Sequence, residues 1–369
     1  MQNLIDRDFS KPQIESAFYA NIKIGESTST KSTRKLPDSL KEWVGSNLLQ
    51  NTDKIELTRF LLKQGYSQEE ILLELEIAST SPYLRAAIKP NKLLKKREWL
   101  LSTCDDLARL DPSYNQQIEV IDTPSFEVFI NEYYSKHRPV VLKKGIDHWP
   151  AFKKWSPQYF VDTLGDTEIE VQFDRESDAL FERYSDRHRK SMLMSDFIRM
   201  IETGGKSNNY YMTANNTKKN IDAIRSVLKD IGDFGEGYRN LIDDPVFSTF
   251  FWMGPKGTFT PIHHDLTNNM LVQVYGSKKI TLIPAWQVPW IYNDVHVFSE
   301  VNFPEVDLKK YPLMQNVTPI EVTIEAGDAL FIPIAWWHCV EGLETSISIS
   351  FTNFNAPNNY GESFKKAQS

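Results

Sequence analysis

Residues 260–265 read Thr-Pro-Ile-His-His-Asp, and residues 331–338 read Phe-Ile-Pro-Ile-Ala-Trp-Trp-His. Two of the three histidines in these stretches, with the one carboxylate, make the facial ligand set that holds non-haem Fe(II). The predicted ligands are His263, Asp265 and His338. Such a set leaves coordination positions open for a co-substrate and oxygen, so the two stretches predict an iron site and an oxidative reaction class.

The spacing selects one histidine of the adjacent pair. The neighbouring residues 270–275 read Met-Leu-Val-Gln-Val-Tyr, a run typical of β-strands. In a strand, residues two positions apart face the same side. His263 and Asp265 can therefore reach one ion together, whereas His264 points the other way and is not predicted to be a ligand.

The case for His338 depends on its surroundings, because a lone histidine in an aromatic run is more often a packed core residue. It follows a predicted turn at Gly327 and a buried strand that ends at Pro333. Antiparallel strands remote in sequence can meet across a barrel, so the long gap to His263 is no objection. If the chain alternates here, one of the tryptophans at 336 and 337 faces the pocket and the other faces away.

The sequence around both metal elements resembles a known family. Residues 268–279 read Asn-Asn-Met-Leu-Val-Gln-Val-Tyr-Gly-Ser-Lys-Lys. With 260–265 and 331–338, they resemble the metal-binding elements of the JmjC-type, cupin-like Fe(II) and 2-oxoglutarate-dependent oxygenases. Residues 138–145 resemble the segment that opens the catalytic domain of that family. The resemblance covers about residues 118–357 and is closest to the branch of the asparaginyl hydroxylase acting on hypoxia-inducible factor.

The resemblance implies a 2-oxoglutarate pocket beside the metal. Lys278 matches the lysine that pairs with the distal carboxylate, where a charge-assisted hydrogen bond would be strong. Thr260 and Asn269 match polar positions that line the pocket. Tyr211 matches a tyrosine on the same ligand, and Tyr210 is the competing register.

Two further positions carry an ambiguity of register. Lys278 stands an odd number of residues after Asp265, so a turn at Gly276 must re-aim its side chain, and Lys279 is the solvated alternative.

In the last predicted strand, 346–354, an ungapped count from the second metal element assigns the family's asparagine to Asn353. Alternation of serine and isoleucine would assign that place to Thr352 instead. Ser350 falls on the other parity from Asn353, so a regular strand cannot turn both toward the metal. We take Asn353.

The implied cofactors are Fe(II), 2-oxoglutarate as co-substrate and O₂. The implied reaction is oxidative decarboxylation of 2-oxoglutarate to succinate and CO₂, coupled to C–H hydroxylation of a protein or peptide side chain. N-methyl-lysine demethylation is the enzyme alternative, disfavoured because this sequence shows no accessory zinc clusters. Hydroxylation of a small molecule or a tRNA base also stays open. A non-catalytic cupin binding module or a cupin isomerase would have no need of Lys278.

Composition limits the partners. The chain has 369 residues and a net charge of −7, which disfavours nucleic-acid binding because that needs a concentrated basic face. Two cysteines cannot make a disulfide framework. With no signal peptide and no membrane-length apolar segment, we expect a cytoplasmic protein without membrane contact. A homodimer would use the amino-terminal helices or the barrel edge.

The chain is predicted to divide near residue 115. Residues 1–35 are polar and are expected to be flexible, residues 36–115 form a helical region, and residues 116–369 form the catalytic domain. Four helices are expected in this region. One begins at Asp38, the second ends at Gly65, the third begins at a capping box of Ser67 and Glu70, and the fourth covers 93–110. The predicted fold is mainly β with flanking helices, a double-stranded β-helix (jelly roll) of the cupin type.

Overall fold

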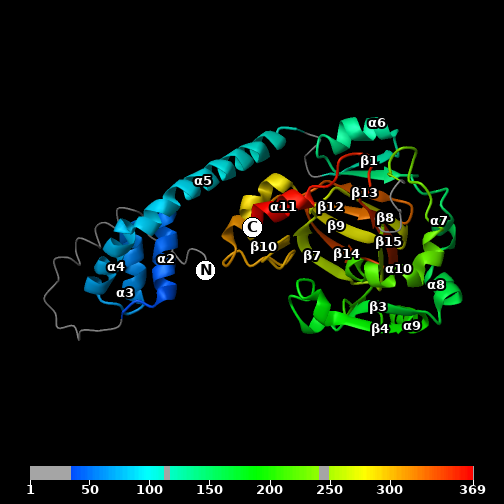
Figure 1. Ribbon diagram of the computed structural model, residues 1–369, viewed down its shortest axis with the longest axis horizontal. Coiled ribbons are helices and arrows are strands. Elements are labelled where there is room, and N and C mark those ends of the chain that lie inside the picture. The colour runs from blue at the N-terminus through cyan, green and yellow to red at the C-terminus, as the bar shows by residue number, and fades with distance from the viewer. Residues whose placement is uncertain (1–34, 112–116, 241–248, 369) are drawn as a thin grey trace. The chain divides into compact units, whose positions relative to one another are not determined.

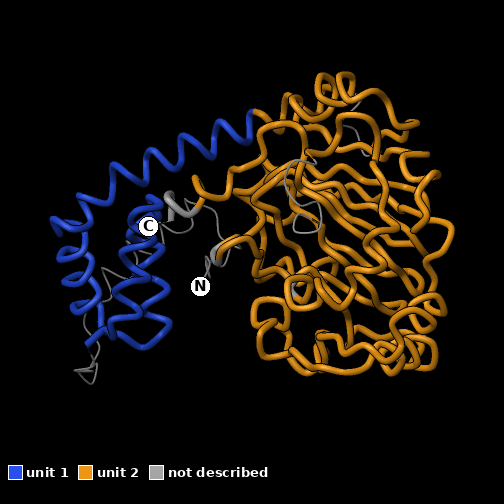
Figure 2. Tube along the Cα trace, turned by 45° about the vertical axis from the view of Figure 1, so that its right-hand side comes forward, with its two compact units in different colours: residues 1–103 blue, residues 104–369 orange. Residues whose placement is uncertain are grey.

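The computed structural model describes residues 35–111, 117–240 and 249–368. The chain divides into two compact units, 1–103 and 104–369, which Figure 2 draws in different colours. The division lies earlier than the predicted boundary near residue 115. The predicted flexible segment, apart from its last residue, lies outside the described residues.

The first unit is helical, as predicted. Its helices are α2 (Asp38–Leu49), α3 (Lys54–Lys63), α4 (Gln68–Thr80) and most of α5 (Pro82–Ala108). The capping box is confirmed at the start of α4, where the Glu70 backbone N–H donates to Ser67 Oγ over 3.3 Å. Apolar side chains of α2, α3 and α4, among them Trp43, Leu61 and Ile71, form the core of this unit.

Helix α5 is longer than predicted. It begins at Pro82 rather than near Leu93 and continues through Pro90, which removes one backbone donor from its interior. Its last turn belongs to the second unit, where the buried Asp105 carboxylate accepts hydrogen bonds from Trp286 Nε1 and Gln287 Nε2 over 3.0 and 2.6 Å. Arg109 Nε is a third donor to the Asp105 carboxylate. These contacts tie the last turn of α5 to the second unit, which explains why the boundary between the units falls within the helix.

The second unit contains two six-stranded sheets that face each other (Figure 1). The first sheet has the order β1 (Glu119–Asp122), β2 (Val140–Lys143), β13 (Ala329–Ile332), β8 (Asn269–Tyr275), β15 (Ser346–Phe351), β6 (Thr249–Gly254). The second sheet has the order β10 (Asn293–Val295), β11 (Phe298–Ser299), β7 (Phe259–His264), β14 (Trp337–Gly342), β9 (Lys278–Ile283), β12 (Ile320–Ile324). All neighbours pair antiparallel except β1 and β2, and the predicted double-stranded β-helix is confirmed.

Helices and a small third sheet cover the outer face of the first sheet. The helices are α6 (Phe126–Phe129), α7 (Pro150–Lys154), α8 (Pro157–Leu164), α9 (Met194–Thr203) and α10 (Ala214–Leu228), and the third sheet has the order β4 (Arg189–Leu193), β3 (Glu168–Phe173), β5 (Tyr210–Tyr211). Their apolar side chains share one core with Val272, Ile349 and Phe351. A final helix, α11 (Gly361–Gln368), follows the barrel. In the described parts of the chain, no helix is long and apolar enough to cross a bilayer.

The space between the two sheets is apolar at one end and polar at the other. Leu271, Leu282 and Trp336 belong to the apolar cluster. Strand β15 alternates, with Ile347, Ile349 and Phe351 in the outer core and the serines at 346, 348 and 350 on the opposite, inward face, all buried. Buried hydroxyls need partners, so this polar end is where the fold can receive a polar ligand.

Candidate metal and co-substrate site

The three predicted metal ligands lie together at the mouth of the barrel. His263 on β7 is directly opposite His338 on β14, with ring centroids 4.2 Å apart. Asp265 follows the end of β7, and its Oδ2 lies 3.9 Å from His338 Nε2. One ligand atom from each residue falls within 4.8 Å of the other two. Among the described residues, this is the one cluster of three or more such side chains with the spacing of a metal site.

A register shift in the sheet aims these side chains. His338 pairs with His263, but two residues further along β14, Val340 pairs with Thr260, three positions back on β7. The extra residue on β7 is therefore Pro261 or Ile262. A bulge is well placed here because proline has no backbone N–H to donate to the neighbouring strand. Because of this bulge, Thr260 and His263 face the same side of the sheet despite their odd spacing.

Both histidines present Nε2 to the metal position. His263 Nδ1 lies 2.8 Å from the Pro261 carbonyl oxygen, and His338 Nδ1 lies 3.0 Å from the Trp336 carbonyl oxygen. A carbonyl can only accept, so each Nδ1 carries a proton and donates it, and Nε2 is the atom that is left to bind a metal. This arrangement is typical of histidines that ligate a metal.

The protonation states agree with a cation site. Burial lowers the pKa of His338, and the nearby His263 lowers it further, so its imidazole is neutral at pH 7. Asp265 Oδ2 accepts a hydrogen bond from Asn269 Nδ2 over 2.9 Å, which fixes the orientation of the carboxylate. Two imidazoles and one anchored carboxylate suit a divalent ion such as Fe(II).

His264 lies on the opposite face of β7. Its ring packs edge-on against Trp337, with centroids 4.7 Å apart, and burial lowers its pKa. Trp336, the other tryptophan, belongs to the apolar cluster between the sheets. The two tryptophans therefore alternate as predicted, and His264 contributes packing.

We expect the His264→Ala variant to bind iron as the parent protein does. Losing the ring contact with Trp337 should lower the free energy of unfolding by about 1–2 kcal/mol. Metal analysis of the purified variant, beside a thermal melt, tests this. Loss of iron from a folded variant would contradict the assignment of His264 to the outer face.

Lys278 is a buried basic residue with a single hydrogen-bond partner among the described residues. Its side chain is 1% exposed, and its Nζ lies 3.2 Å from Tyr211 Oη. Across the described ranges, no carboxylate forms an ion pair with it, and desolvation lowers its pKa to about 7. A buried ammonium without a counterion is costly unless an anion binds, so this group fits the carboxylate of a dianionic co-substrate.

The structure separates the two competing registers. Gly276, with φ of +72°, turns the chain between β8 and β9 and brings Lys278 inward. Lys279 points outward and pairs with Glu321 and Glu341. On β5, Tyr211 meets Lys278, whereas the hydroxyl of Tyr210 donates to the Met200 carbonyl oxygen 2.6 Å away.

Small residues on β6 and β15 form the part of the site that faces Lys278 and Tyr211. A Cβ on Gly254 would lie 2.5 Å from Tyr211 Cδ2, so no larger residue fits there. Ser346, opposite Gly254 in register, is fully buried, and its Oγ has no hydrogen-bond partner among the described residues. Asn269 Oδ1 is likewise buried and unpartnered within the described ranges, and Thr260 is buried on the same inner face. These orphaned polar atoms fit a carboxylate-bearing ligand.

Two residues that the sequence did not single out also lie at this pocket. Trp252 on β6 places its ring 5.9 Å from Lys278 Nζ and 5.8 Å from the Tyr211 ring. Arg175 is 1% exposed, donates through Nη2 to the Phe259 carbonyl oxygen and lies 5.1 Å from the Tyr211 ring. The alternation of β6 could have revealed Trp252, but nothing in the sequence marks Arg175.

The assignment of Asn353 to the pocket is corrected by the structure. Strand β15 ends at Phe351, and the Asn353 side chain binds elsewhere. Its Nδ2 donates to the Asn240 carbonyl oxygen over 2.9 Å, and its Oδ1 accepts from Arg239 Nε over 3.3 Å. Asn353 has the parity of Phe351, which faces the outer core, so the ungapped count selected the wrong side of the strand.

We expect Asn353→Ala to leave the KM for 2-oxoglutarate unchanged. Removing both amide contacts should lower the free energy of unfolding by about 1–2 kcal/mol. Steady-state kinetics and chemical denaturation measure the two effects separately. A marked rise in that KM, with unfolding unaffected, would restore Asn353 to the pocket.

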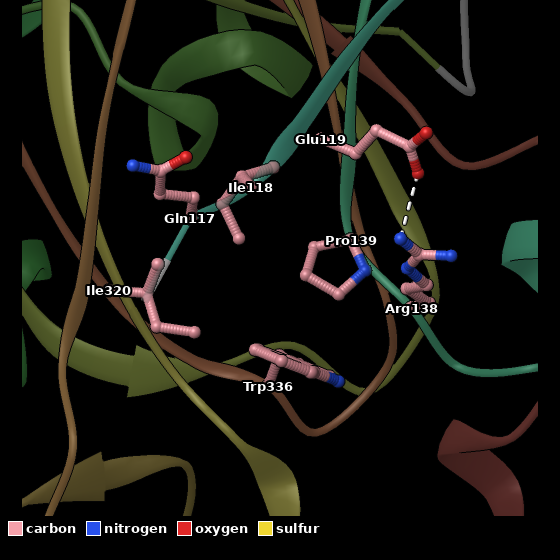
Figure 3. A pocket seen from close by; sticks show the side chains of 7 residues that line it. All are labelled: Gln117, Ile118, Glu119, Arg138, Pro139, Ile320 and Trp336. Atoms are coloured by element: carbon pink, nitrogen blue, oxygen red, sulfur yellow. Dashed lines mark hydrogen bonds and ion pairs between the residues drawn. The ribbon is translucent and has the colours of Figure 1, made fainter. Parts of the chain in front are cut away.

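A separate small cavity is lined by none of the three predicted metal ligands (Figure 3). Its volume is about 10 Å³, enough for one water, and an ion pair of Arg138 and Glu119 borders it. Trp336 and Ile320 form the opposite wall. Neither its size nor its lining suits a substrate, so it is part of the scaffold.

The fold and the site together define a cupin barrel with a two-histidine, one-carboxylate metal centre and a buried lysine. Residues 125–360 match the family of the cupin-like domain. The chain therefore belongs to the cupin-like, JmjC-type family, whose members are in general Fe(II)- and 2-oxoglutarate-dependent oxygenases.

Curated relatives carry several different names. "Lysine-specific demethylase 8" of Xenopus tropicalis is 29% identical over 242 residues, covering 63% of this chain and 52% of the relative. "Lysine-specific demethylase JMJ30" of Arabidopsis thaliana is 28% identical over 236 residues, covering 62% and 52%. "tRNA wybutosine-synthesizing protein 5" of Gallus gallus is 26% identical over 246 residues, covering 63% and 76%. The chain spans about half the length of the two demethylase-named relatives, and the closer likeness to the asparaginyl hydroxylase branch stays a prediction.

Proposed function

We propose that this protein is an Fe(II)- and 2-oxoglutarate-dependent hydroxylase of a protein or peptide side chain. The reaction would convert 2-oxoglutarate, O₂ and a C–H bond to succinate, CO₂ and a C–OH group. The observation that carries the proposal is the pairing of two sites in one barrel. The Nε2 atoms of two histidines and a carboxylate converge on one point, and the same barrel buries the Lys278 ammonium, which has no ion pair in the described part of the chain.

Each protein group has a definable task in this reaction. His263, Asp265 and His338 would hold the iron, which supplies the oxygen-activating chemistry when bound. Lys278 and the Tyr211 hydroxyl would hold the distal carboxylate of 2-oxoglutarate. A co-substrate held by Lys278 at one end and by the metal at the other would have its orientation fixed by these contacts.

We place the substrate beside the segment that links the two metal-binding elements, 260–265 and 331–338. Strand β11 belongs to this linking segment, and Phe298 pairs directly with His263, with ring centroids 6.1 Å apart. From the opposite side, Arg183 donates through Nη2 to the Ser299 carbonyl oxygen over 2.7 Å, which ties residues 178–188 to the linking segment. The proposed peptide or protein substrate would therefore meet the side chain of Phe298 next to the ligand His263.

Succinate release tests the proposal. Protein purified without oxygen is given Fe(II), 2-oxoglutarate and air, and we expect slow succinate formation even without the substrate. Asp265→Ala should abolish it, whereas His264→Ala should not. No succinate from the parent protein, together with no binding of 2-oxoglutarate by calorimetry, would refute the proposal.

Demethylation is the second candidate, and the names of two relatives favour it. Hydroxylation of an N-methyl carbon gives a hemiaminal that releases formaldehyde, so demethylation is a special case of the same C–H chemistry. Mass spectrometry of peptide substrates separates the two outcomes. A gain of one oxygen atom supports hydroxylation, and formaldehyde with loss of a methyl group supports demethylation.

A further inference from the structure

Helix α4 carries two apolar faces where a surface helix normally needs one. Ile71 and Leu75 are buried in the core of the helical unit, at 0% and 2% exposure. On the other side, Leu72, Leu73 and Ile77 are 47%, 61% and 54% exposed. Because the first face already secures the helix to its own unit, the second face is available for another partner.

Helix α5 has a similar exposed face. Leu93, Leu94 and Leu100 are each more than half exposed, and between Pro82 and Thr103 the helix contributes no buried residue. Leu93 and Leu100 are one heptad apart, so they lie nearly in line along the helix. Monomeric proteins seldom leave apolar faces of this kind open, and such faces usually mark an interface.

The charges beside these two faces are opposite. On α4, the exposed carboxylates Glu69 and Glu76 lie among the leucines. On α5, the exposed Lys89 and Lys96 flank Leu93. In the described part of the chain, none of these four side chains forms an ion pair. Pairing α5 with another α5 would bring like charges together, whereas pairing α4 with α5 matches apolar to apolar and acid to base.

We propose that the helical unit, residues 36–103, joins a second copy of this chain. In the dimer, α4 of each copy packs on α5 of the other. This arrangement is isologous, since one two-fold axis generates both contacts from a single self-complementary surface. The proposal concerns assembly and does not depend on the proposed oxygenase activity. We name the exposed residues of α4 (Glu69, Leu72, Leu73, Glu76, Ile77) and of α5 (Lys89, Leu93, Leu94, Lys96, Leu100) the α4/α5 surface.

Sedimentation velocity of the full chain over a range of concentrations tests the proposal. We expect a dimer, and Leu93→Gln with Leu100→Gln should weaken it by more than about tenfold, the scale of central apolar residues in an interface. Leu180→Gln with Leu308→Gln, two exposed leucines of the other unit, is the matched control and should leave the dimer intact. Circular dichroism establishes that each variant is folded.

Charge reversal gives a sharper test of which helices meet. Glu69→Lys with Glu76→Lys makes α4 basic, and Lys89→Glu with Lys96→Glu makes α5 acidic. Each variant alone should be monomeric at concentrations where the parent is dimeric. Mixed one to one, the two should form a heterodimer, because every α4/α5 contact then joins opposite charges.

Three results would overturn the proposal. The full chain could be monomeric at all concentrations. If the leucine variant then also had a lower melting temperature than the parent, the exposed face of α5 would be covered by another part of the same chain. A dimer could survive both the leucine and the charge variants, which would place its interface elsewhere. The charge variants could also fail to recombine on mixing, which would exclude the pairing of α4 with α5.

Discussion

Replacing His338 by alanine should abolish both iron binding and succinate formation. The side chain supplies one of three ligands, and its Nε2 is already set by the hydrogen bond from Nδ1 to the Trp336 carbonyl oxygen. Removing a hydrogen-bond partner of a ligand typically lowers metal affinity by about 10–100-fold, so loss of a ligand itself should exceed about 100-fold. Metal analysis and succinate release are measured on the same preparation.

The His338→Ala variant should remain folded, which makes the result interpretable. The ring is buried and makes a single hydrogen bond, to the backbone, among the described residues. Its removal should therefore lower the free energy of unfolding mainly through the lost packing. His264→Ala is the matched control, since it removes an imidazole from the same pair of strands without touching the metal position. If His338→Ala retained iron and activity, the ligand assignment would be refuted.

Much of this architecture could be predicted from the sequence because it depends on local rules. The alternation of residues along a strand separated His263 from His264, and the capping box placed the start of α4. The resemblance to the JmjC-type family supplied the barrel. The first two signals lie within a short stretch of chain, and the resemblance is carried by motifs that are each short, so none needs knowledge of what packs against it.

The features that the sequence did not reveal depend on contacts between distant segments. The bulge beside Pro261 is visible only in the pairing of β7 with β14, yet it turns Thr260 and His263 to one side. Asn353 was misplaced because an ungapped count cannot detect that its amide binds the segment at 239–240. The second apolar face of α4 could be recognised only once burial showed which leucines its own core used.

Replacing Lys278 by methionine should raise the KM for 2-oxoglutarate by about 100-fold or more, while iron stays bound. Loss of one partner of a buried charge pair costs about 3–5 kcal/mol, and methionine fills similar space without a charge. Lys279→Met is the matched control. Its side chain points outward to Glu321 and Glu341, so this substitution should leave the KM within about twofold, as expected for a surface ion pair. An unchanged KM in Lys278→Met would place the carboxylate site elsewhere.

The same lysine should make co-substrate affinity depend on pH. Desolvation lowers its pKa to about 7 in the ligand-free pocket, so the ammonium is progressively lost as the pH rises above that value. Binding a dianion requires the charged form, and the protein must then take up a proton, which raises the Kd about tenfold for each pH unit above 7. Lys278→Arg, whose guanidinium stays charged, should remove this dependence even if affinity falls. Calorimetric titration with 2-oxoglutarate between pH 6.5 and 8.5 measures both proteins, and a pH-independent Kd in the parent would show that Lys278 does not hold the co-substrate.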